Sequence, residues 1–259
     1  MGFIIFAVCL CASTIGGICG IGGGVIIKPV LDALGLMSVS AISFLSGISA
    51  MMMAAISVFR QRKLHLVEVR TGSLLAVGSI VGGIAGYSLF QAIRAAAQQD
   101  ALVGMVQAIL LGLVTLLTLV YSAFLRSRLR SYEVKAPAAC IAIGCLMGLL
   151  SSFLGIGGGP INLAILYFAF SMTTKKAAAN SLYIILCSQL ANLVTYLVRG
   201  TVPAFPWPYL LIMAAGFLGG MLGTRINRRI SEKTTERLFS GLLAGIVLIC
   251  VYNALRFAL

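Results

Sequence analysis

The pentapeptide GIGGG stands at residues 20–24 and again at residues 155–159, each time inside a long apolar stretch. Glycine favours helix less than every residue except proline, so three in a row interrupt a membrane helix. The apolar stretches that follow, at 25–36 and 160–171, contain twelve residues each, and helices of that length reach only about 18 Å. Because a bilayer core is about 30 Å thick, each GIGGG is predicted to turn a re-entrant helical hairpin.

The composition is that of a protein embedded in a lipid bilayer. Of its 259 residues, 60% are hydrophobic and 10% are charged, and the mean hydropathy is +1.08. These values lie far outside the range of soluble domains. Other apolar stretches fall at residues 3–19, 38–59, 71–93, 102–125, 136–154, 177–198, 207–224 and 238–257. The sequence therefore predicts an all-α integral membrane protein that crosses the lipid bilayer several times.

A net charge of +13 would suggest nucleic acid as the partner of a soluble protein, but here the placement of the charges excludes that partner. Fifteen of the nineteen basic residues fall in four connections, and the positive-inside rule places these connections in the cytoplasm. They are Arg60, Arg62, Lys63 and Arg70; Arg126, Arg128, Arg130 and Lys135; Lys175 and Lys176; and Arg225, Arg228, Arg229, Lys233 and Arg237. Two hairpins that open to opposite sides satisfy the rule and place both termini outside.

The two halves of the chain also resemble each other. GIGGG recurs at an offset of 135 residues, and VGGIAG at 81–86 matches LGGMLG at 218–223. For this second pair we expect only close helix packing. Each half is therefore predicted to contain one hairpin and three transmembrane helices. Because three is an odd number of spans, the second half is inverted in the membrane relative to the first. We predict two inverted repeats, 1–125 and 136–259, joined by a basic cytoplasmic connection at 126–135, as is common in secondary transporters.

The glycines themselves predict an anion site. Unwound backbone is tolerated at membrane depth only where protein or a water-filled cavity covers it, and helix N-termini with free N–H groups attract anions. The predicted ligands are the N–H groups of Gly22, Gly23, Gly24, Gly157, Gly158 and Gly159. The alternative is that these glycines, too, serve only close packing.

The segments GIGGGVIIKPVLDALG at 20–35 and GIGGGPINLAIL at 155–166 resemble the paired signatures of the TauE/SafE sulfite exporter family, also called the toluene sulfonate uptake permease family. The resemblance covers essentially the whole chain. It implies a transporter in the inner membrane of a prokaryote for small anions such as sulfite, sulfonates or sulfoacetate. Members of the family differ in transport direction, so the resemblance does not distinguish export from uptake.

Further substrate-binding candidates come from polar residues in the apolar stretches, namely Lys28, Ser46, Asn162, Asn180 and Ser181. Lys28 would supply a positive charge, although Asp32 lies four residues on and offers an ordinary i,i+4 pair. The amide of Asn162 would donate to an oxyanion. Gln189 and Asn192 share one helical face. For each of these residues, a hydrogen bond between helices is the structural alternative.

Enzymatic and metal functions find no support in the sequence. The seven cysteines form no C-x-x-C pair, and GIGGG lacks the Gly-Lys-Ser/Thr of a phosphate loop. We therefore expect no enzyme, no cofactor and no metal. Cys19, beside Gly20, is a further candidate contact for a sulfur substrate. The shortage of buried titratable groups favours export as a uniport, because an anion leaving a negative interior gains about 2.3 kcal/mol per charge per 100 mV. The alternatives are uptake of another solute and a membrane scaffold or sensor subunit.

Overall fold

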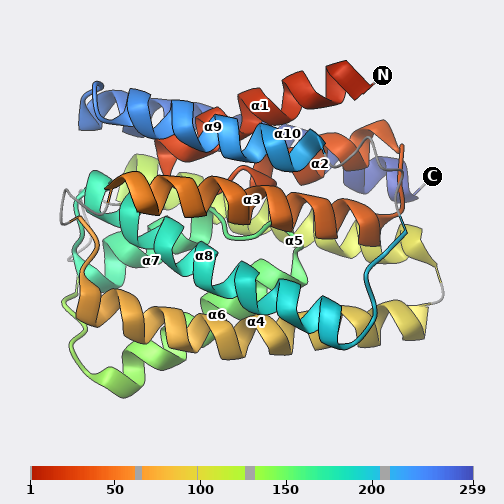
Figure 1. Ribbon diagram of the computed structural model, residues 1–259, viewed down its shortest axis with the longest axis horizontal. Coiled ribbons are helices and arrows are strands. Elements are labelled where there is room, and N and C mark those ends of the chain that lie inside the picture. The colour runs from red at the N-terminus through yellow and green to blue at the C-terminus, as the bar shows by residue number, and fades with distance from the viewer. Residues whose placement is uncertain (1, 62–65, 98, 126–131, 205–210, 259) are drawn as a thin grey trace.

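The computed structural model describes residues 2–61, 66–97, 99–125, 132–204 and 211–258, and every regular element in these ranges is helical. The helices run along one long axis and form a bundle (Figure 1). They are α1 (Gly2–Cys19), α2 (Gly24–Leu34), α3 (Val39–Gln61), α4 (Val69–Ala97), α5 (Asp100–Val120) with the π-helical turn η2 (Tyr121–Leu125), α6 (Pro137–Phe153), α7 (Pro160–Phe170), α8 (Thr174–Val198), α9 (Leu211–Asn227) and α10 (Glu232–Ala258). The all-α prediction is confirmed.

Five helices of the described chain are long and apolar enough to cross a membrane. They are Val39–Gln61, Val69–Ala97, Asp100–Leu125, Thr174–Val198 and Glu232–Ala258. The helix α9 contains 17 residues, and part of the stretch predicted for it, 207–210, lies outside the described residues. A chain with several such helices is a multi-pass membrane protein.

The two short helices after the glycines are one residue shorter than the predicted stretches of twelve. Each contains 11 residues and so extends about 17 Å. Pro160 opens α7, in the first helical turn, where its missing N–H removes no hydrogen bond. Both segments are therefore half-spans; α2 follows the longer helix α1 and α7 follows the longer helix α6 along the chain.

The helices α2 and α7 run to opposite ends of the bundle. At the end of α2, the backbone carbonyl of Asp32 accepts a hydrogen bond from Arg256, near the end of α10. The helix α7 ends just before α8, whose first residue Thr174 donates to Glu236 at the start of α10, at 2.6 Å. The two hairpins consequently open in opposite directions (Figure 1).

The basic connections gather at one end of the bundle, to the extent that the structure describes them. Arg228, after α9, donates to the Arg60 carbonyl at the end of α3, and Lys176 of α8 pairs with Glu68, just before α4, at 3.4 Å. The backbone N–H of Tyr132 donates to Phe168 at the end of α7. Arg62, Lys63, His65, Arg126, Arg128 and Arg130 lie outside the described residues. The orientation of this end toward the cytoplasm stays a prediction.

Close helix packing explains the second glycine-rich pair. A methyl group added at Gly82 of α4 would lie 1.9 Å from the Cys145 carbonyl oxygen of α6. One added at Gly223 of α9 would lie 2.5 Å from the Thr14 carbonyl oxygen of α1. Only glycine permits such approach of two helix backbones. The packing role predicted for VGGIAG and LGGMLG is confirmed.

Candidate functional site

Each GIGGG turn depends on backbone angles that glycine adopts without strain. The φ angles are 78° at Gly20 and 84° at Gly22 in the first turn, and 64° at Gly155, 70° at Gly157 and 134° at Gly158 in the second. The chain can therefore reverse within five residues and begin a new helix on the other side of the break.

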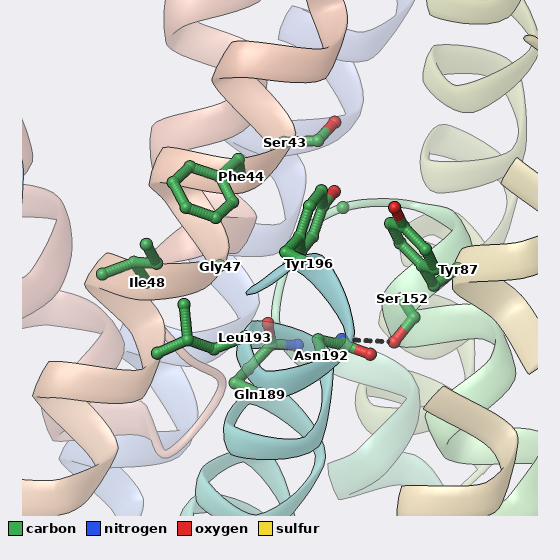
Figure 2. Close-up of a pocket in the computed structure, with 11 residues that line it drawn as sticks. Ser43, Phe44, Gly47, Ile48, Tyr87, Ser152, Gln189, Asn192, Leu193 and Tyr196 are labelled. Carbon is green, nitrogen blue, oxygen red and sulfur yellow. Dashed lines mark hydrogen bonds between the residues drawn. The ribbon is translucent and has the colours of Figure 1, made fainter. Parts of the chain in front are cut away.

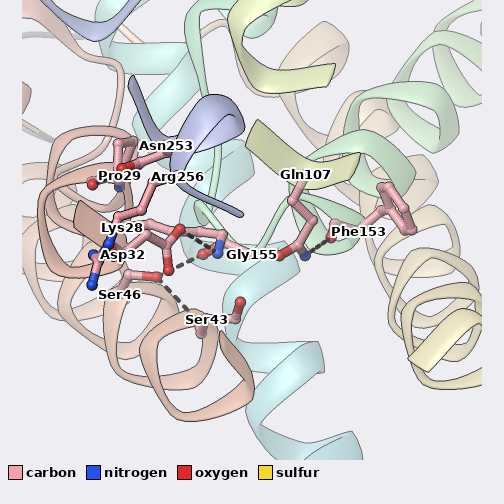
Figure 3. Close-up of polar contacts among 10 residues, drawn as sticks. All are labelled: Lys28, Pro29, Asp32, Ser43, Ser46, Gln107, Phe153, Gly155, Asn253 and Arg256. Atoms are coloured by element: carbon pink, nitrogen blue, oxygen red, sulfur yellow. Dashed lines mark hydrogen bonds and ion pairs between the residues drawn. The ribbon is translucent and has the colours of Figure 1, made fainter. Parts of the chain in front are cut away.

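Side-chain amides donate hydrogen bonds to backbone carbonyl groups that have lost their helical partners at the breaks. Gln107 of α5 donates to the Phe153 carbonyl at the end of α6, at 2.6 Å (Figure 3). Asn227 of α9 donates to the Ile18 carbonyl at the end of α1, also at 2.6 Å. Ile18 and Phe153 are related by the repeat offset of 135 residues, so both breaks are stabilised in the same way despite different donors.

The two turns meet at the centre of the bundle. A methyl group added at Gly24 would lie 2.3 Å from the Ile156 carbonyl oxygen, and one added at Gly22 would lie 4.0 Å from the Gly157 carbonyl oxygen. Segments 135 residues apart in sequence thus touch through their main chains. The two turns are therefore neighbours in space, and an anion site between them stays a prediction.

Two apolar side chains fill the space around this contact. A methyl group at Gly157 would lie 2.7 Å from Ala50 of α3, and one at Gly158 would lie 2.2 Å from Ile185 of α8. Neither glycine N–H donates to another described residue, nor does that of Gly159. The donors expected for an anion are therefore free, but in this conformation Ala50 and Ile185 pack against the turn.

A polar cavity opens beside the second turn. It is enclosed by α3, α4, α8 and the end of α6 and has a volume of about 20 Å³, enough for about one water molecule. Its polar lining residues are Ser43, Ser152, Gln189 and Asn192, together with the backbone of Gly47 and Gly155. Figure 2 shows Asn192 donating to Ser152, at 2.6 Å. The cavity thus combines neutral hydrogen-bonding groups with an unwound backbone.

Aromatic rings form one wall of the cavity. Tyr196 packs edge-on against Phe44, with ring centroids 4.9 Å apart, and against Tyr87, with centroids 4.6 Å apart. The Tyr87 hydroxyl is hydrogen-bonded to Thr201, in the connection after α8. The three rings therefore form one aromatic wall, with Tyr196 between Phe44 and Tyr87 (Figure 2).

Lys28 is buried and paired with Asp32. Its Nζ lies 2.9 Å from Asp32 Oδ2, and the two side chains are 1% and 6% exposed. The helix α10 covers this segment, because Asn253 donates to the Pro29 carbonyl at 2.8 Å and Arg256 to that of Asp32 (Figure 3). Lys28 is not among the residues that line the cavity. The i,i+4 alternative is confirmed, and a substrate contact by Lys28 stays a prediction.

The other predicted side chains fall in three different places. Ser46 of α3 donates to the Gly155 carbonyl at 2.6 Å and so holds the second turn. Asn180 lies near the start of α8, where it accepts from the Glu68 N–H and donates to the Leu66 carbonyl. Asn162 and Ser181 are buried, with an oxygen atom that has no hydrogen-bond partner among the described residues.

The structure therefore brings together Ser46 and the six glycines, but it places Asn180 at a connection. The cavity includes residues that the sequence argument did not select, above all Ser43, Gln189 and Asn192. Gln189, Asn192 and Tyr196 are spaced three and four residues apart on one face of α8. That spacing is the feature from which the cavity wall could have been identified. In the described ranges no three His, Cys, Asp or Glu residues cluster as metal ligands.

Paired broken helices, crossing helices and a buried polar cavity define the class of the protein as a polytopic membrane transporter. Residues 5–249 match the family described as sulfite exporter TauE/SafE. The chain belongs to this family, as its glycine signatures indicated.

Curated relatives agree with this class. The chain is 24% identical to the "Probable membrane transporter protein YunE" of Bacillus subtilis, over an alignment that covers 85% of this chain and 86% of the relative. It is 26% identical to a "Probable membrane transporter protein" of Methanocaldococcus jannaschii, over 72% of this chain and 69% of the relative. No solved structure matches.

Proposed function

We propose that this chain is a secondary transporter that exports small sulfur-containing anions, of the sulfite, sulfonate or sulfoacetate type, across the inner membrane of a prokaryote. The observation that carries the proposal is the polar cavity beside the second glycine turn, whose lining includes buried side-chain oxygens without a hydrogen-bond partner among the described residues. The family name supports the substrate class. In this proposal the anion lies between the two turns, held by their N–H groups and the cavity side chains.

The transport cycle follows from two inverted repeats that rock against each other. The opposite directions of α2 and α7 and the clustering of the basic connections at one end support this arrangement. The cavity of about 20 Å³ is too small for a sulfonate, so helices α3 and α8 must separate to admit one. We propose that the basic end faces the cytoplasm and that both termini lie outside.

Export needs no coupling ion in this mechanism. An anion leaving a cell that is negative inside gains about 2.3 kcal/mol per charge per 100 mV. The cavity lining includes no carboxylate or histidine that would carry a proton. Lys28 and Asp32 neutralise each other at 2.9 Å, and we propose that they serve the stability of α2.

The test is efflux of sulfite from proteoliposomes under an imposed potassium-diffusion potential, with no proton or sodium gradient. The expected result is efflux that accelerates as the interior becomes more negative and that is lost in Gln189→Leu. Gln189 makes no hydrogen bond to another described residue, so this change should not disturb folding. Efflux that ignores voltage but follows a proton gradient would overturn the uniport. Absence of transport for sulfite, methanesulfonate and sulfoacetate alike would overturn the substrate class.

A further inference from the structure

We infer that the cavity binds singly charged anions and rejects doubly charged ones. This inference rests on the proposed function and narrows its substrate class. Its basis is the lining of the cavity, in which the polar side chains are Ser43, Ser152, Gln189 and Asn192 with Tyr87 and Tyr196, all without formal charge. An anion in this place is held by neutral hydrogen bonds alone.

The donors that would hold one negative charge are present. Ser43 is 6% exposed and its hydroxyl has no partner among the described residues. The Ser152 oxygen accepts from Asn192, which leaves its own O–H free to donate. The Gln189 amide also has no hydrogen-bond partner in the described chain. These three side chains line the cavity next to the break at Gly155.

A hydrogen-bond acceptor among the cavity residues, the side-chain oxygen of Asn192, disfavours a second negative charge on the bound anion. Asn192 is 6% exposed, and its Oδ1 has no hydrogen-bond partner among the described residues. A carbonyl oxygen repels the oxygens of a fully ionised dianion, but it accepts a hydrogen bond from an O–H or N–H group. The cavity therefore favours an anion that has one charge and, in the best case, one donor.

The charged groups nearest to the cavity do not change this balance. Lys28 is neutralised by Asp32 at 2.9 Å. The Arg199 guanidinium lies 5.6 Å from the centre of the Tyr87 ring, and Arg199 is exposed to the surroundings. Because the cost of burying an ion rises with the square of its charge, a neutral site offsets that cost for a monoanion far better than for a dianion.

Among sulfur oxyanions, hydrogen sulfite and simple sulfonates such as methanesulfonate carry one charge, whereas sulfite, sulfate, thiosulfate and sulfoacetate carry two. The inference therefore removes sulfoacetate from the proposed substrates. The experiment measures thermal stabilisation of the detergent-purified full chain by methanesulfonate, sulfate and total sulfite at matched ionic strength. Each is tested about one pH unit below and one above the second pKa of sulfurous acid. Ligand binding to the native state raises the unfolding temperature.

The expected result is stabilisation by methanesulfonate at both pH values, none by sulfate, and an apparent sulfite affinity about tenfold lower at the higher pH. The last effect follows because only about a tenth of the sulfite is then singly charged. Methanesulfonate serves as the pH control, because its charge does not change. Ser43→Ala and Gln189→Leu should weaken every shift. Ser88→Ala, which removes an exposed hydroxyl of α4 bonded to Ile84, should weaken none.

Two results separate this inference from the proposed function. The charge selection would be overturned if sulfate stabilised the protein as strongly as methanesulfonate does. It would also be overturned if total sulfite stabilised the protein more strongly at the higher pH. Either result would still be consistent with a transporter of sulfur-containing anions. No shift with any of the three anions would overturn the proposed function as well.

Discussion

The two glycine turns share one sequence, but they differ in what surrounds them. The cavity borders the second turn at Gly155. The equivalent Gly20 of the first turn does not line it. Both glycines are closely packed, since a methyl group would lie 2.5 Å from Ser43 at Gly155 and 2.4 Å from the equivalent Ala178 at Gly20, but only Ser43 brings a polar group. The backbone motif therefore provides two breaks, and the side chains of the neighbouring helices decide which break borders a cavity.

The repeat offset of 135 residues makes this comparison specific. Gln189 and Gly47, which line the cavity, correspond to Ala54 and Leu182. Both of these lie in an apolar cluster with Ala50, Met53 and Ile185. Thus α3 and α8 line a polar cavity on one side of the glycine turns and form an apolar cluster at the repeat-equivalent positions.

The largest expected effect concerns a feature found only in the first half. Lys28 and Asp32 form the buried pair of α2, whereas the equivalent residues of α7 are the buried Leu163 and Tyr167. Lys28→Met leaves the Asp32 charge buried without its partner, and should cost about 3–5 kcal/mol of unfolding free energy. Lys28→Met/Asp32→Leu should recover most of that loss. Denaturant unfolding in detergent checks both, and equal stability of the single variant and the wild type would contradict the account.

A second prediction compares two neighbours within the second turn. Gly158 has a φ of 134°, and a methyl group there meets Ile185 at 2.2 Å. Gly159 is extended, and its nearest neighbour would be the flexible end of Ile156, at 3.0 Å. Gly158→Ala should destabilise by about 2–4 kcal/mol, and Gly159→Ala by less than about 1 kcal/mol. Thermal unfolding of the two variants provides the test; equal losses would argue against the strained turn.

A smaller effect distinguishes two serines related by the repeat offset. Ser46 donates to the Gly155 carbonyl at 2.6 Å, whereas the Ser181 hydroxyl has no partner among the described residues. Ser46→Ala should cost about 1 kcal/mol, and Ser181→Ala should leave stability nearly unchanged. The unfolding midpoints of the two alanine variants measure the difference, and a larger loss for Ser181→Ala would reverse the assignment.

Much of this fold follows from the sequence, because the glycine runs and the basic connections constrain it locally. The half-span lengths of α2 and α7 depend only on where Gly24 and Pro160 begin them. The position of the cavity could not be predicted from these local features, because it depends on which residues of α3 face α8. Asn180 illustrates the difficulty: its polarity suggested a site, but its depth along α8 places it at the connection around Glu68.

The most direct test of the account is voltage-driven sulfite efflux from proteoliposomes for two variants measured side by side. Gln189→Leu changes the cavity of the second turn, and Lys28→Met/Asp32→Leu changes the charged pair of the first half. The account predicts that efflux falls at least about tenfold in Gln189→Leu, as loss of a hydrogen bond to an ion implies, and persists in the double variant. Efflux that persists in Gln189→Leu and disappears in a stably folded double variant would place the anion at Lys28 and contradict the account.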